Sequence, residues 1–187
     1  MDLSKTPALH YFLMSVCRFY YDSKSNVLWC KIRKAGSTTY VSTFARVADK
    51  RLAKVRHRGS WGQENKMFRL HSGNVAAVLA RKPFLFAVSR HPYERLVSVF
   101  TDFSQKTGVN EKKWRVRGSF EKFLEDQVLK QAESCDGDSC DVNPHWDSMD
   151  NMCSFCVLNY TVLSSMETFA EDFSHITARL GLEELAR

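Results

Sequence analysis

The feature that most constrains the fold is an apolar run that ends in a basic turn of small residues. Val27–Ile32 predicts a buried strand near the middle of a parallel sheet. The turn Arg33–Ser37 follows, and from Thr38 onward apolar residues recur at helical spacing: Val41, Phe44, Ala45, Ala48 and Leu52. A strand, a tight turn and a helix in this order aim backbone N–H groups at the turn, where the helix dipole favours an anion. The sequence therefore predicts an anion-binding loop.

A second junction of the same kind follows later in the chain. Phe84–Val88 predicts another buried strand, and it leads into Ser89-Arg90-His91-Pro92. Proline suits the first turn of a helix, whose predicted buried face is Tyr93, Leu96, Val97, Phe100 and Phe103. The guanidinium of Arg90 and the hydroxyl of Ser98 suit a phosphate monoester. Taken alone, a salt-bridged arginine and an exposed serine are the commoner explanation.

The remaining elements complete an alternating pattern. The N-terminal stretch is expected to be partly helical and to pack on the sheet edge. Helices are predicted over 75–81 and from Phe120 to Val128, the latter capped by Ser119. A third strand is predicted over 156–163. Ser164–Glu167 has capping-box spacing, and the helix after it is expected to end at Gly181. Alternating strands and helices predict a three-layer α/β fold, a parallel sheet flanked by helices. With 187 residues, one domain over 1–187 is expected.

Composition narrows the class of partner. The chain has 27 Lys and Arg against 21 Asp and Glu, a net charge of +6, which favours acidic partners. The basic run from Arg46 to Arg58 is a solvated face or a docking surface for a polyanion. No apolar run approaches the roughly 20 residues of a membrane helix, and no cleavable signal peptide is evident.

The six cysteines leave alternatives open. Four of them cluster and are either a zinc site or two disulfides: Cys135, Cys140, Cys153 and Cys156. Cys30 is expected to be an ordinary core residue. Asp136-Gly137-Asp138 lacks the rest of an EF-hand loop, so calcium is not expected there.

The first junction is not the phosphate loop of nucleotide hydrolases. That motif places Gly-Lys-Ser/Thr after an earlier glycine, whereas here Lys34 precedes Gly36. Kinase or GTPase chemistry is therefore disfavoured.

Three blocks of sequence resemble the Golgi carbohydrate sulfotransferases of the chondroitin and HNK-1 type. Residues 30–39 resemble the family's 5′-phosphosulfate loop, and residues 84–98 its 3′-phosphate motif. Pro144-His145-Trp146, Cys153–Cys156, Tyr160, Glu167-Thr168 and Asp172 resemble a third segment. The blocks run in the expected order over residues 28–182. The resemblance implies a P-loop-like sulfotransferase fold and the donor 3′-phosphoadenosine 5′-phosphosulfate (PAPS), with no metal.

The resemblance also implies residue roles. Lys34 would meet the bridging oxygen of the sulfate, and Arg90 and Ser98 would hold the 3′-phosphate. The remaining donor-binding residues of the loop would be Arg33, Ala35, Gly36, Ser37, Thr38 and Thr39. A base must take the acceptor's proton. His57, His71 and His145 are candidates, of which His71 and His145 are retained.

The family's location changes other expectations. Its members are anchored type II proteins of the Golgi lumen, so disulfides outrank zinc for the clustered cysteines. This chain has no anchor and a short C-terminus by the family's standard, and is expected to be soluble in the lumen, secreted or a fragment. Asn159-Tyr160-Thr161 is a glycosylation sequon, but its place in a predicted strand argues against use.

The favoured hypothesis is a PAPS-dependent enzyme that sulfates a hydroxyl of an anionic glycan. An inactive anion- or glycan-binding module with the same fold is the alternative. Nucleic-acid binding ranks last, because stacking aromatic residues are not interleaved with the basic ones. The acceptor sugar and the oligomeric state are not determined by the sequence.

Overall fold

The structure is a computed structural model that describes residues 18–48, 69–71, 73–105, 116, 118–134 and 142–183. The chain forms two compact units, which we call the sheet unit (residues 1–89 and 149–187) and the helical unit (residues 90–148). The expectation of a single domain stays a prediction. Among the described residues there is no helix long and apolar enough to cross a membrane.

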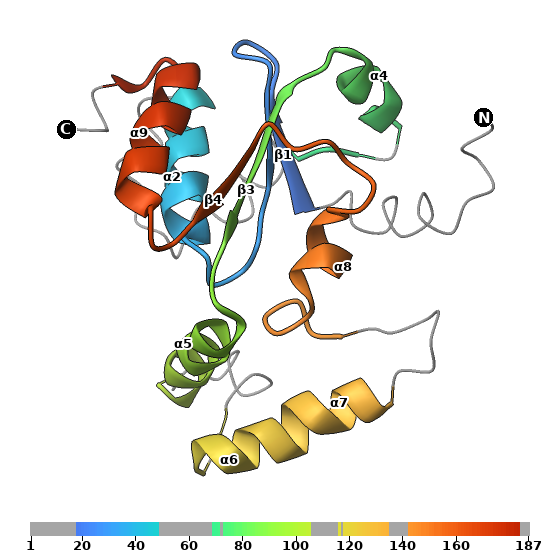
Figure 1. Ribbon diagram of the computed structural model, residues 1–187, viewed down its shortest axis with the longest axis vertical. Helices are drawn as coiled ribbons and strands as arrows, with labels where there is room; N and C mark the ends of the chain where they lie inside the picture. Colours follow the sequence, from blue (N-terminus) through green and yellow to red (C-terminus); the bar gives the residue numbers. More distant parts are fainter. Residues whose placement is uncertain are drawn as a thin grey trace. The chain divides into compact units, whose positions relative to one another are not determined.

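A four-stranded mixed sheet forms the centre of the sheet unit (Figure 1). Its strands, in spatial order, are β1 (Phe19–Asp22), β2 (Val27–Cys30), β3 (Phe84–Ser89) and β4 (Val162–Ser165). The predicted strands β2 and β3 are confirmed as parallel neighbours, and β4 is parallel to β3. The all-parallel prediction is wrong at β1, which is antiparallel to β2.

The short connection between β1 and β2 explains the antiparallel pair. Only residues 23–26 separate the strands, and so short a turn can join only antiparallel neighbours. Asp22 accepts a hydrogen bond from the Ser25 backbone N–H (2.9 Å), and Asn26 has a φ of 52°. The end of the N-terminal stretch lies at the sheet edge as predicted, but as a strand instead of a helix.

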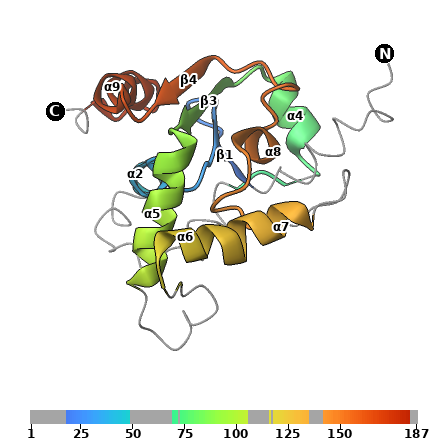
Figure 2. The same ribbon diagram turned by 60° about the horizontal axis from the view of Figure 1, so that its bottom comes forward.

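Helices cover both faces of this sheet (Figures 1 and 2). Helices α2 (Ser37–Ala48) and α9 (Phe169–Arg179) lie side by side on one face, and α4 (Val75–Ala80) and α8 (Met149–Cys153) lie on the other. Neighbouring strand residues point to opposite faces. Trp29 therefore packs on Tyr40 and Phe44 of α2, with ring centroids 5.4 and 5.5 Å apart.

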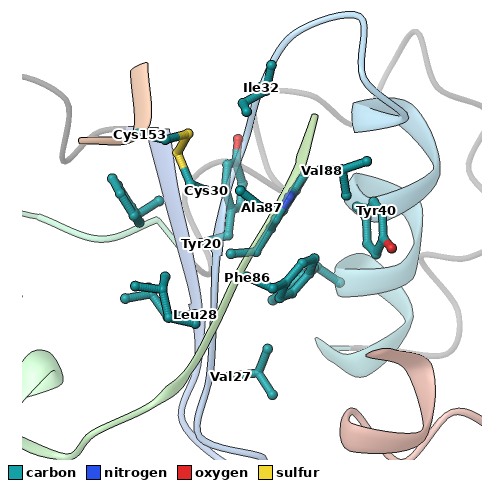
Figure 3. Packing of buried hydrophobic residues seen from close by; sticks show 14 of the residues in the cluster. Tyr20, Val27, Leu28, Cys30, Ile32, Tyr40, Phe86, Ala87, Val88 and Cys153 are labelled. Carbon is teal, nitrogen blue, oxygen red and sulfur yellow. A yellow bond between two sulfur atoms is a disulfide. The ribbon is translucent and has the colours of Figure 1, made fainter. Parts of the chain in front are cut away.

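The opposite face of β2 carries a disulfide. Leu28 and Cys30 point away from α2, and Cys30 is bonded to Cys153 of α8 (Figure 3). Cys30 lies in the core as expected, but it is not an ordinary core cysteine. Its disulfide partner lies 123 residues away in the sequence, where no local pattern reveals it. The bond removes Cys153 from the clustered set, and Cys156 is a free, exposed cysteine, so neither the four-thiol zinc site nor two disulfides within that set can form. Cys135 and Cys140 lie outside the described residues.

The C-terminal third of the sheet unit departs from prediction in three ways. The strand expected over 156–163 begins at Val162, because residues 154–158 form a tight turn in which Val157 N–H and Leu158 N–H both donate to the Ser154 carbonyl. Asn159 is therefore exposed and outside β4, so the argument against its sequon fails. The capping box is also wrong: the helix cap is Thr168, whereas Ser164 lies within β4.

The helical unit consists of α5 (Pro92–Ser104) and a continuous helical run of α6 (Phe120–Phe123), η5 (Leu124–Leu129) and α7 (Lys130–Glu133), visible in Figure 2. Ser119 caps α6 as predicted by accepting a hydrogen bond from the Lys122 N–H. The predicted buried face of α5 is partly wrong. Tyr93 and Val97 are 73% and 51% exposed, and the buried face is Arg95, Val99 and Phe103.

Candidate active site

The predicted anion loop joins β2 to α2 within the sheet unit. Thr39 N–H and Tyr40 N–H both donate to the Gly36 carbonyl (3.0 and 3.3 Å), so the helix begins directly after the turn. No acidic side chain lies in the first turn of α2 to repel an anion. The predicted contacts differ in exposure: Ala35 and Ser37 are buried, Arg33, Lys34 and Gly36 half-buried, and Thr38 and Thr39 exposed.

Lys34 and Gly36 both adopt left-handed backbone conformations, with φ of 66° and 65°. Such a conformation is costly for a residue with a side chain, and it concentrates at functional turns. Lys31, by contrast, is buried, and its Nζ donates to the Tyr20 hydroxyl at 3.4 Å. Of the two lysines, Lys31 therefore lies in the core and Lys34 lies in the turn.

The segment between β4 and α9 packs against this loop. A Cβ added to Gly36 would lie 2.6 Å from Cε2 of Phe169, so only glycine fits there without displacement. Phe169 in turn stacks on Phe173 and meets the ring of Tyr40 edge-on. The start of α9 therefore buttresses the loop, a role that spacing alone did not reveal.

Asp172 fixes the start of α9. It accepts a hydrogen bond of 2.6 Å from the Thr168 hydroxyl, and the Thr168 N–H donates to the Ser165 hydroxyl at 3.3 Å. Hydrogen bonds from Thr168, then from Ser164, hold the pKa of Asp172 below its usual value. Burial, and then the nearby charge of Asp172, raise the pKa of Tyr40. Both groups are thus held in one protonation state near neutral pH.

In the helical unit, Arg90 stands immediately after β3 and before α5. Its Nε lies 3.2 Å from Oε2 of Glu94, one turn along the helix, and its side chain is 27% exposed. Ser98 lies in α5, eight residues or about two helical turns after Arg90, and is half-buried. The salt bridge expected of a lone arginine is therefore present, and the Arg90 side chain is only partly buried.

Arg95 is a residue whose role the sequence did not suggest. Its guanidinium is buried and donates from both terminal nitrogens to the Asp147 carbonyl, each at 3.2 Å. Burial lowers the pKa of Arg95 to about 10, against the opposing effect of Asp147. The group stays charged at neutral pH and ties α5 to the turn that contains His145.

His145 and His71 differ in their surroundings. The His145 ring packs edge-on against Phe103 with centroids 4.9 Å apart, and its backbone N–H donates to Asn143, which is an environment typical of a structural histidine. His71 is exposed. The structure does not test either residue as a base, and His57 lies outside the described residues.

Strand register locates His71 relative to the loop. Arg69 pairs antiparallel with Tyr20, which is itself opposite Trp29, so the segment 69–71 runs in the direction of β2. His71 is then level with Lys31 across the sheet. The two residues are separated by two inter-strand spacings, or about 10 Å. It lies at the same end of the sheet as the anion loop.

Among the described residues, no three His, Cys, Asp or Glu side chains lie together in a way that could hold a metal ion. The first residue of the basic run, Arg46, is at the end of α2, whereas residues 49–68 lie outside the described ranges.

Comparison with known proteins identifies the family. No curated protein and no solved structure matches the chain significantly. The family model described as "Sulfotransferase family" matches residues 17–187, nearly the whole chain. This α/β chain, with its basic strand–loop–helix junction, therefore belongs to the sulfotransferase family.

Proposed function

We propose that this protein transfers the sulfuryl group of PAPS to a hydroxyl of an anionic glycan. Family membership supports sulfuryl transfer as the reaction class. The observation that carries the donor assignment is the loop itself: a lysine and a glycine in left-handed conformations, at the N-terminus of a 12-residue helix without an acidic first turn. That set of groups suits a phosphosulfate.

In the proposed division of roles, Arg33 to Thr39 bind the 5′-phosphosulfate, and Arg90 and Ser98 bind the 3′-phosphate. The acceptor oxygen attacks sulfur in line, the bond from sulfur to the bridging oxygen breaks, and the electron pair leaves on that oxygen. The ammonium of Lys34 stabilises the developing charge. Phe169 packs against the turn at Gly36, two residues after Lys34.

A histidine takes the acceptor's proton in this scheme. His71 is favoured over His145, because it is exposed and lies at the loop's end of the sheet, whereas the His145 ring is packed on Phe103. The Golgi lumen is the proposed compartment, supported by the disulfide between Cys30 and Cys153. Membrane attachment and glycosylation at Asn159 belong to the same proposal.

The test is transfer of labelled sulfate from PAPS to a panel of glycans, run beside donor-binding calorimetry. Lys34→Ala should lower kcat about 100-fold or more, since one group on the leaving oxygen is lost, while donor affinity falls by less than tenfold. Lys82→Ala, an exposed lysine that also has a positive φ, is the matched control. Equal losses of turnover and affinity in Lys34→Ala would contradict the leaving-group role.

A further inference from the structure

A basic groove lies in the sheet unit at the opposite end of β2 from the anion loop. It has a volume of about 560 Å³ and is lined by the β1–β2 turn and the C-terminal ends of α2 and α9. Three cationic residues reach it from three different elements: Lys24, Arg46 and Arg179. Volumes of this order are usual for small-ligand sites.

The charge of the groove is not cancelled by its own lining. Asp22 is the acidic residue in the lining, and its carboxylate accepts hydrogen bonds from the backbone and the hydroxyl of Ser25. Among the described residues, neither Lys24 nor Arg46 takes part in an ion pair. The lining therefore carries two more positive than negative charges.

Helix dipoles account for only part of this arrangement. Arg46 and Arg179 lie in the last turns of α2 and α9, where cations offset the carbonyl ends of the helices. Lys24 has no such reason to be there, because it belongs to the turn between β1 and β2. Arg179 is also held in place, with its guanidinium 5.1 Å from the centroid of the Phe84 ring.

The groove also has an apolar side. Val47, Leu180 and Leu182 contribute to the lining, and both leucines are 6% exposed. An apolar surface rimmed by cations suits a sugar ring that has an apolar C–H face and carries acidic groups, such as a uronate or a sulfated sugar.

We propose that this groove binds an anionic sugar segment of the glycan acceptor, remote from the hydroxyl that is sulfated. The choice of a glycan as the anion rests on the proposed function. Arg46 lies nine residues after Ser37 on α2, about 14 Å along the helix axis, so the groove and the anion loop are separate contacts. Two contacts on one chain raise avidity without any change at the reacting atoms.

The test is calorimetry with a heparin-derived tetrasaccharide, with uncharged maltotetraose as the control ligand. Lys24→Glu and Arg46→Glu should each weaken tetrasaccharide binding about tenfold, and the slope of log K against log salt should fall by about one unit per charge removed. Arg46→Lys, which keeps the charge, and Lys82→Glu, which changes a charge outside the groove, should stay within threefold of wild type.

Three results would overturn the proposal: no binding by wild type, equal binding of maltotetraose, or equal losses in Lys82→Glu and Arg46→Glu. Lys24 is in an exposed turn, so its variant decides the matter if Arg46→Glu fails to fold. Binding of 3′-phosphoadenosine 5′-phosphate is measured on the same samples and should not change. Tetrasaccharide binding without nucleotide binding would support the groove and contradict the proposed function.

Discussion

Two residues of the anion loop have left-handed backbones for different reasons. Gly36 is required because Phe169 occupies the space that a side chain would need. Lys34 has a side chain and bears the cost of the conformation, about 1–3 kcal/mol for such a residue. That cost is consistent with a lysine kept for its chemistry.

Gly36→Ala tests the packing of the loop directly. We expect it to lower the free energy of unfolding by about 1–3 kcal/mol, because the new Cβ meets Phe169 and φ is 65°. Gly73→Ala is the matched control, since a Cβ there has no atom within 4 Å. Urea denaturation measures both, and a Gly36→Ala protein as stable as the control would contradict the structure.

Asp172 gives a prediction for acid stability. The pKa of Asp172 is lower in the folded protein than in the unfolded chain, where it is about 3.8. Its ionised carboxylate therefore stabilises the folded state above pH 3.8, and this stabilisation is lost as pH falls through the lower pKa of the folded state. Wild type should therefore lose more stability than Asp172→Asn between about pH 4 and pH 2. Thr168→Val, which removes the first hydrogen-bond donor, should reproduce part of that change. Parallel curves of melting temperature against pH would disprove the assignment.

At the scale of elements, the disulfide joins β2 to α8 just before the anion loop. Because 123 residues separate its cysteines, the bond restricts a large loop of the unfolded chain. Replacing both residues with alanine should lower the free energy of unfolding by about 2–5 kcal/mol. Cys156→Ser, at an exposed free cysteine, should have no effect. Identical denaturation midpoints for the double variant and wild type would show that the bond does not form.

The elements that were predicted correctly are those with local signals. Strands β2 and β3 and helix α2 follow from apolar runs and helical spacing, and α5 begins at Pro92 as expected. The start of β4 was missed because the turn after α8 depends on Ser154, whose φ is 51°. No pattern in the sequence marks that residue.

The face of α5 was mispredicted for another reason. Apolar spacing assigned Tyr93 and Val97 to the core, but Arg95 is buried there because the carbonyl of Asp147 accepts from its guanidinium. Such a partner lies 52 residues away in the sequence. Burial of a charged residue depends on long-range contacts that periodicity does not encode.

For the whole molecule, sequence and structure agree on an α/β chain of the sulfotransferase family. The turn of Arg33 to Thr39 between a strand and a helix was predictable, because its signals lie in consecutive residues; its part in donor binding stays a proposal. The support that Phe169 and Asp172 give to this part of the structure was not predictable, because it arises only when α9 packs beside α2. The same holds for the basic groove, whose three cations come together only in the folded sheet unit.

The proposed function requires that the protein bind a nucleotide with phosphates at both the 5′ and 3′ positions. Calorimetry on wild type and Arg90→Ala, each with 3′-phosphoadenosine 5′-phosphate and with adenosine 5′-monophosphate, tests it most directly. We predict that wild type binds the bisphosphate at least tenfold more tightly, because Arg90 pairs with the second phosphate, and that Arg90→Ala loses this preference. Arg81→Ala, an exposed arginine of the sheet unit, should retain it. Absence of bisphosphate binding by wild type, or an unchanged preference in Arg90→Ala, would contradict the account.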